Sequence, residues 1–144
     1  MSESKKIHSK GKEYIINANK FLIFEGEYLN GERNGKGKEY DIFGNLVFEG
    51  EYLNGERNGK GKEYNIFGIL EFEGEYLNDK KWNGKEKQKY KNGKIKFERE
   101  YINGKRSGKG YNKDWILEYE IVNGNSKNLK EYEYDGRLIS EGEY

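Results

Sequence analysis

One phrase occurs twice in this chain without a change. Residues 24–40 read FEGEYLNGERNGKGKEY, and residues 48–64 repeat the same seventeen letters. Weaker copies begin at Phe72, Phe97 and Leu117, and a fragment, SEGEY, occupies residues 140–144. A recurrence at a fixed spacing is typical of repeat proteins, in which each unit buries its apolar side chains against neighbouring units. The repetition therefore constrains the fold more than any single motif does.

The pattern within one unit predicts β-structure. Residues 24–28 (Phe-Glu-Gly-Glu-Tyr) alternate in polarity as a strand does. Residues 30–35 contain two Asn-Gly steps, which favour a tight turn, and a second strand is expected over residues 36–40. Glycine interrupts every helical window. We therefore predict an all-β fold, an elongated array of stacked antiparallel β-hairpins that form a single meandering twisted sheet. Further turns are expected at Gly44, Gly68, Gly93 and Gly136.

A register for the hairpins follows if the two strands close around residues 30–35. It places Tyr28 opposite Gly37, where the ring covers backbone that glycine leaves bare, and Glu27 opposite Lys38. The later units repeat this arrangement in the pairs Tyr52 with Gly61, Glu51 with Lys62, and Tyr101 with Gly110.

Domain organisation is expected to be simple. Residues 1–10 are polar and basic and predict a flexible tail. Residues 11–144 predict one array with units that start near residues 24, 48, 72, 97 and 117, and with half-units at both ends.

Composition narrows the class of protein. Only 33% of residues are hydrophobic and 37% are charged, but aromatic residues make up 15%, which favours an ordered chain with a thin core of rings. The net charge of +1 argues against a general nucleic-acid-binding protein. Since the chain has no Cys, no apolar run of about 20 residues and no signal-peptide pattern, we expect a cytoplasmic protein without disulfides.

No set of residues predicts catalysis or cofactor binding. His8 is the one histidine and lies in the polar tail, so no Ser/His/Asp or Cys/His arrangement can be assembled. The phrase Gly35-Lys36-Gly37-Lys38 lacks the spacing of a phosphate-binding loop. The recurring Glu pairs indicate a solvated strand face rather than paired catalytic carboxylates or a calcium site. We predict a protein that is not an enzyme and has no cofactor or metal site.

Charge is distributed unevenly along the chain. Residues 24–47 and 48–71 each carry three basic and five acidic side chains, whereas residues 72–96 carry eight basic and four acidic ones. The excess of lysine suggests a surface for anionic lipid headgroups or an acidic partner; the alternative is a set of solvated lysines that keep the sheet soluble. The candidate contact residues are Lys80, Lys81, Trp82, Lys85, Lys105 and Arg106.

The phrase in residues 24–37, Phe-Glu-Gly-Glu-Tyr-Leu-Asn-Gly-Glu-Arg-Asn-Gly-Lys-Gly, resembles the MORN (membrane occupation and recognition nexus) repeat family. Residues 48–61 match equally well, and residues 97–110 match with Arg99 in place of the first glycine. The 24-residue spacing looks like the variant branch that is common in bacteria, some members of which carry antitoxin-type labels. The resemblance implies a β-hairpin array that serves in scaffolding, protein association or contact with anionic lipid.

Three functions remain open on this evidence. The first is a non-enzymatic repeat scaffold that binds a protein partner in a groove or through its open end strand. The second is a peripheral membrane module that binds anionic phospholipid through the basic region around residues 80–106. The third is an antitoxin-like bacterial repeat protein. An end-to-end or edge-strand homo-oligomer is a further expectation.

Overall fold

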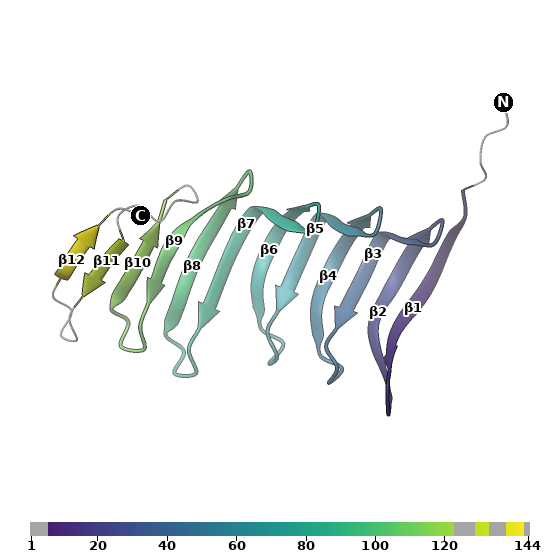
Figure 1. The fold of residues 1–144 in the computed structure, drawn as a ribbon, viewed down its shortest axis with the longest axis horizontal. Coiled ribbons are helices and arrows are strands. Elements are labelled where there is room, and N and C mark those ends of the chain that lie inside the picture. The colour runs from purple at the N-terminus through teal and green to yellow at the C-terminus, as the bar shows by residue number, and fades with distance from the viewer. Residues whose placement is uncertain (1–5, 123–128, 133–137, 143–144) are drawn as a thin grey trace. The chain divides into compact units, whose positions relative to one another are not determined.

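The computed structural model describes residues 6–122, 129–132 and 138–142, and every described regular element is a strand (Figure 1). The chain divides into two compact units, which we call the first unit (Met1–Lys80) and the second unit (Lys81–Tyr144). Neighbouring strands in the chain pair antiparallel within each unit, which confirms the predicted all-β class of antiparallel hairpins.

The first unit holds six strands in chain order. They are β1 (His8–Ile16), β2 (Lys20–Leu29), β3 (Glu32–Tyr40), β4 (Leu46–Leu53), β5 (Glu56–Tyr64) and β6 (Leu70–Leu77). β1 begins at His8, so the last three residues of the predicted tail lie in a strand.

The second unit is shorter and less regular. Its strands are β7 (Lys80–Lys89), β8 (Ile95–Ile102), β9 (Lys105–Tyr111) and β10 (Leu117–Ile121), followed by the paired strands β11 (Leu129–Tyr132) and β12 (Leu138–Gly142). The first residue of β7, Lys80, is the last residue of the first unit. The turn predicted at Gly136 lies outside the described residues.

The predicted register is wrong, because the two Asn-Gly steps have different roles. Asn30 and Gly31 form the two-residue turn, both with positive φ (50° and 81°), whereas Gly35 (φ 97°) lies within β3 at an irregularity of the pairing. Tyr28 therefore pairs with Arg33, and Gly37 pairs with Gly26 on one side. The predicted pairing of Tyr101 with Gly110 is also wrong, since Tyr101 pairs with Arg106.

The charge pairs move in the same way. Glu25, not Glu27, lies opposite Lys38, and Glu49, not Glu51, lies opposite Lys62. Opposite charges still face each other across each pair of strands, so the interaction that motivated the prediction is kept with different partners.

A row of glycines crosses the first unit, one from each strand. The register pairs Gly11 with Gly26, Gly26 with Gly37, Gly37 with Gly50, Gly50 with Gly61, and Gly61 with Gly74. On one face of the sheet, aromatic rings cover this row. A Cβ on Gly37 would lie 2.6 Å from the ring of Phe24 and 2.9 Å from that of Tyr52. Glycine is therefore required here because rings occupy the space of its missing side chain.

The core of the first unit is this ring face. Phe24, Phe48 and Phe72 are fully buried although the sheet has a single layer. Tyr52 lies edge-on between Phe24 (5.2 Å between ring centroids) and Phe48 (5.7 Å), and the guanidinium of Arg33 lies 4.0 Å above the ring of Phe24. A ring over an opposing glycine was the right principle, but the rings that cover Gly37 are those of Phe24 in the same repeat and Tyr52 in the next repeat, rather than that of Tyr28.

Candidate binding surfaces of the first unit

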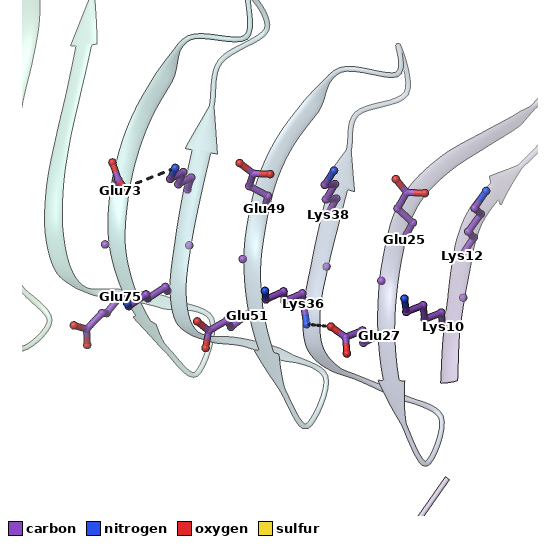
Figure 2. A pocket seen from close by; sticks show the side chains of 18 residues that line it. Lys10, Lys12, Glu25, Glu27, Lys36, Lys38, Glu49, Glu51, Glu73 and Glu75 are labelled. Carbon is purple, nitrogen blue, oxygen red and sulfur yellow. Dashed lines mark hydrogen bonds and ion pairs between the residues drawn. The ribbon is translucent and has the colours of Figure 1, made fainter. Parts of the chain in front are cut away.

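A hollow of about 1370 Å³ runs across the other face of the first unit, from β1 to β6 (Figure 2). The glycine row forms its floor, and charged side chains stand in two rows along its sides, as Figure 2 shows. One row is Lys10, Glu27, Lys36, Glu51, Lys60 and Glu75; the other is Lys12, Glu25, Lys38, Glu49, Lys62 and Glu73. Lysine and glutamate alternate from strand to strand, so the hollow has no net charge. This pattern offers no field that favours a polyanion.

Two tyrosines connect the hollow to the ends of the strands. The hydroxyl of Tyr40 donates to Glu25 Oε1 (2.6 Å), and that of Tyr64 donates to Glu49 Oε1 (2.5 Å). Burial and the hydrogen bond to Glu25 raise the pKa of Tyr40 to about 12. The hydrogen bond to Glu49, followed by burial, raises the pKa of Tyr64 to about 12. Both hydroxyls are therefore protonated donors at neutral pH and hold their carboxylates in place.

Ion pairs connect successive repeats on the ring face, the face of the sheet opposite the hollow. Glu39 accepts from Arg57 Nε (2.8 Å) and lies 3.4 Å from Arg33 Nη1, so it joins the guanidinium groups of two successive repeats. At the first strand Glu13 takes this place: it accepts from Arg33 Nε (2.6 Å) and from the hydroxyl of Tyr28 (2.9 Å). The hydrogen bond from Arg33 holds the pKa of Glu13 below its usual value. These contacts are structural, since they cover the ring face.

Apolar side chains are exposed at the end of β1 and on the loops that join β3 to β4 and β5 to β6. These strand connections lie along one edge of the first unit (Figure 1). We call these side chains the apolar loop row: Ile15, Ile16, Ile42, Phe43, Ile66, Phe67 and Ile69. The exposed fraction is 82% for Phe43 and 71% for Phe67. Folding does not bury these rings, so packing within the unit does not explain why the loops carry them.

The loops that carry these rings are held rigidly. Asp41 Oδ1 accepts from the backbone N–H groups of Phe43 and Asn45, each at 2.9 Å. Asn65 Oδ1 accepts in the same way from Phe67 (2.9 Å) and Ile69 (3.0 Å). These are Asx-type turns, in which the side chain replaces backbone partners. The exposed rings are thus presented in a fixed geometry.

The sequence analysis missed the apolar loop row, although a signal was present. Ile42-Phe43 and Ile66-Phe67 are apolar pairs inside turns, a place where polar residues are usual. The corresponding loop of the second unit carries Lys91 and Asn92 instead.

The predicted contact residues do not share one environment in the second unit. Lys81 is paired with Glu86, and Lys85 lies opposite Glu100. Trp82 packs near the turn glycine Gly104, where an added Cβ would meet its ring at 2.8 Å. Lys105 lies opposite Ile102, and Arg106 lies opposite Tyr101, while Lys80 ends the first unit. Acidic neighbours therefore offset part of the basic charge that the sequence concentrates here.

The described residues 6–122 contain no group of three His, Cys, Asp or Glu side chains that could hold a metal ion. No helix long and apolar enough to cross a membrane occurs in the part of the chain that the structure describes.

The hairpins, their glycine row and the rings that link successive repeats define a β-hairpin repeat protein. The family model for the MORN repeat matches residues 24–41, 48–65 and 100–111, and the chain is a MORN repeat protein. No curated protein and no solved structure matches the chain.

Proposed function

We propose that this chain is a non-enzymatic scaffold that binds a partner protein through the apolar loop row of its first unit. The observation that carries the proposal is the exposure of Phe43 and Phe67 on loops fixed by Asp41 and Asn65. A monomeric protein rarely displays several large apolar side chains along one edge unless another molecule covers them.

The spacing and rigidity of these loops favour tight binding of a partner. Successive loops are two strands apart, which corresponds to about 9.6 Å. Burial of one exposed Phe is worth roughly 1.5–3 kcal/mol, and the loops lose little conformational freedom on binding because side-chain hydrogen bonds already fix them. A row of such anchors favours an extended apolar segment of the partner.

Charge favours a protein over an anionic membrane as the partner of this row. Residues 24–71 carry six basic and ten acidic side chains, so a surface of anionic lipid would be repelled. The hollow beside the loops is neutral and lined by donors and acceptors, which suits a polar polypeptide backbone.

The test uses a photo-crosslinking residue placed at position 43, in cells that make the protein natively. The matched control places the same residue at position 53, because Leu53 is an exposed apolar side chain at the opposite end of β4. We expect one protein to crosslink from position 43 and not from position 53, and the double variant Phe43→Ser/Phe67→Ser to abolish this while Leu53→Ser/Leu77→Ser preserves it. Equal crosslinking from both positions would refute a protein partner. So would a protein that crosslinks to no partner but binds neutral liposomes in a way that Phe43→Ser/Phe67→Ser abolishes.

A further inference from the structure

In the described part of the first unit, β1 has a Glu-Gly-Glu strand on one side only, whereas the other strands that carry Lys-Gly-Lys have one on each side. β3 and β5 carry the sequence Lys-Gly-Lys, and each lies between two strands that carry Glu-Gly-Glu. β1 carries Lys10-Gly11-Lys12 and pairs with β2 on one side. Among the described residues of the first unit, no strand pairs with its other side.

The same edge lacks one aromatic ring. Tyr52 and Tyr76 each lie against two phenylalanines, their own and that of the preceding repeat, and are 4% and 3% exposed. Tyr28 lies against Phe24 at 5.7 Å and remains partly exposed. A second phenylalanine beside it would complete the pattern.

The glycine on β1 shows where that ring would lie. Gly37 is buried because the ring of Phe24, from the preceding strand, and the ring of Tyr52, from the following strand, both cover it. Gly11 is covered by Tyr28, from the following strand, since an added Cβ would lie 3.0 Å from that ring, and Gly11 is not buried. The half of its surface that faces the missing strand is therefore uncovered.

The backbone of β1 also presents hydrogen-bonding groups to which another strand could pair. Ile7 and Asn30 bond to each other, since the N–H of Asn30 donates to Ile7 O (2.9 Å) and the N–H of Ile7 donates to Asn30 Oδ1 (3.0 Å). Hydrogen-bonding direction alternates along an antiparallel strand, so the N–H and C=O groups of His8, Lys10 and Lys12 face the free edge. An exposed row of this kind is a template for strand addition.

We propose that the edge of β1 binds a β-strand of a partner protein that reads aromatic, acidic, glycine, acidic. In the register of β2 on β3, the glycine lies opposite Gly11 and the first acidic residue lies opposite Lys12. The second acidic residue lies at the irregularity beside Lys10, and the ring covers Gly11 beside Tyr28. This surface is separate from the apolar loop row. A second copy fits less well, because the segment Ser140-Glu141-Gly142 of this chain carries serine at the ring position.

The probe is a labelled peptide with the sequence of β4, residues 46–53 (LVFEGEYL), titrated onto the full chain and followed by fluorescence anisotropy. We expect saturable binding, at least tenfold weaker when the peptide's Phe is replaced by Ala or when Lys10→Glu/Lys12→Glu is introduced in the protein. A peptide with Lys in place of both Glu should bind that double variant at least tenfold better than the native chain.

Two further variants separate the edge from the rest of the molecule. His8→Pro removes one outward N–H without changing either charge row and should weaken the peptide severalfold. Phe43→Ser should leave peptide binding unchanged, so failure of the loop-row proposal and failure of this one are distinguishable. The proposal would be overturned if the peptide showed no saturable binding, or if its binding were insensitive to His8→Pro and to the charge exchange. It would also be overturned if sedimentation showed that the chain self-associates and that this displaces the peptide.

Discussion

The two units solve the same packing problem in different ways. In the first unit, cross-strand glycines such as Gly37 and Gly50 leave space for rings to pack against the sheet. In the second unit, the equivalent pair is Glu86 and Arg99, which face each other on β7 and β8. Arg99 Nη1 lies 3.2 Å from Glu86 Oε1, and its guanidinium lies 3.8 Å above the ring of Phe97. An ion pair between the buried Glu86 and the partly buried Arg99 thus replaces two glycines, and Lys81 and Tyr119 supply further partners.

The difference shows which part of the repeat is interchangeable. A ring covered by an arginine persists in both units, as in Phe24 with Arg33 and Phe97 with Arg99. What changes is the source of the arginine and the presence of space beside the ring. Glycine and the ion pair are therefore alternative ways of closing a single-layer sheet, and they should respond differently to substitution.

The largest effect is expected for Gly50→Ala in the first unit. The added Cβ would lie 2.5 Å from Lys60 O and 2.7 Å from Gly61 Cα, and the backbone must shift to accommodate it. We expect a loss of about 3 kcal/mol in the free energy of unfolding. Hydrogen exchange of peptides from β4 and β5 measures it, with Gly44→Asn as control, since no atom lies within 4 Å of a Cβ at Gly44. Equal effects of both variants would show that the glycine row is not sterically required.

The next effect is expected for Glu86→Ala in the second unit. Glu86 is 6% exposed and lies between Lys81 and Arg99, so its removal takes the shared carboxylate away from two partly buried positive charges. We expect a loss of about 2–3 kcal/mol, which denaturation monitored by the fluorescence of Trp82 and Trp115 reports. The double variant Glu86→Gly/Arg99→Gly recreates the glycine pair and should cost less than Glu86→Ala alone. A double variant less stable than the single one would mean that the units are not built on interchangeable solutions.

Alkaline pH tests the hydroxyl–carboxylate contacts of the first unit. The pKa of Tyr40 and Tyr64 is raised to about 12 from an ordinary value of 10.0. A pKa raised in the folded state stabilises the fold below pH 10, and this contribution is lost as pH rises from 10 to 12. We expect Tyr64→Phe to cost about 1.5 kcal/mol at pH 8 and much less at pH 12. Urea denaturation of the two proteins at both pH values gives the comparison; a cost independent of pH would contradict it.

The matched variant in the second unit is Tyr90→Phe. Its hydroxyl donates to the backbone carbonyl of Tyr111 (2.7 Å), a neutral acceptor, whereas Tyr64 donates to a carboxylate. We therefore expect a smaller cost at pH 8, about 0.5–1 kcal/mol.

Strand alternation, turn chemistry and repeat spacing were enough to predict the all-β hairpin fold. The register was not predictable from them, because Asn30-Gly31 and Asn34-Gly35 are the same dipeptide, and the first forms the turn whereas the second lies at an irregularity within β3. The loss of glycine at Glu86 and at Arg99 was visible in the sequence, but their pairing depends on that register. The charge pattern drew attention to the lysines of the second unit, whereas exposure, which only the structure gives, identified the loops of the first.

The smallest effect concerns the turn that follows β9. Trp115 has a φ of 61°, a conformation that favours glycine, at the position where the other three turns carry Gly44, Gly68 and Gly93. Its ring lies 5.7 Å from that of Tyr111 and is more than half exposed. Trp115→Gly relieves about 1 kcal/mol of backbone strain and forfeits part of that in the ring contact, so we expect a net gain of about 0.5 kcal/mol in thermal denaturation. Gly93→Trp should lose stability for the same reason. If Trp115→Gly instead destabilises the second unit, the contact with Tyr111 outweighs the strain, and the turn has replaced glycine by a ring in the way that the strands have replaced it by an ion pair.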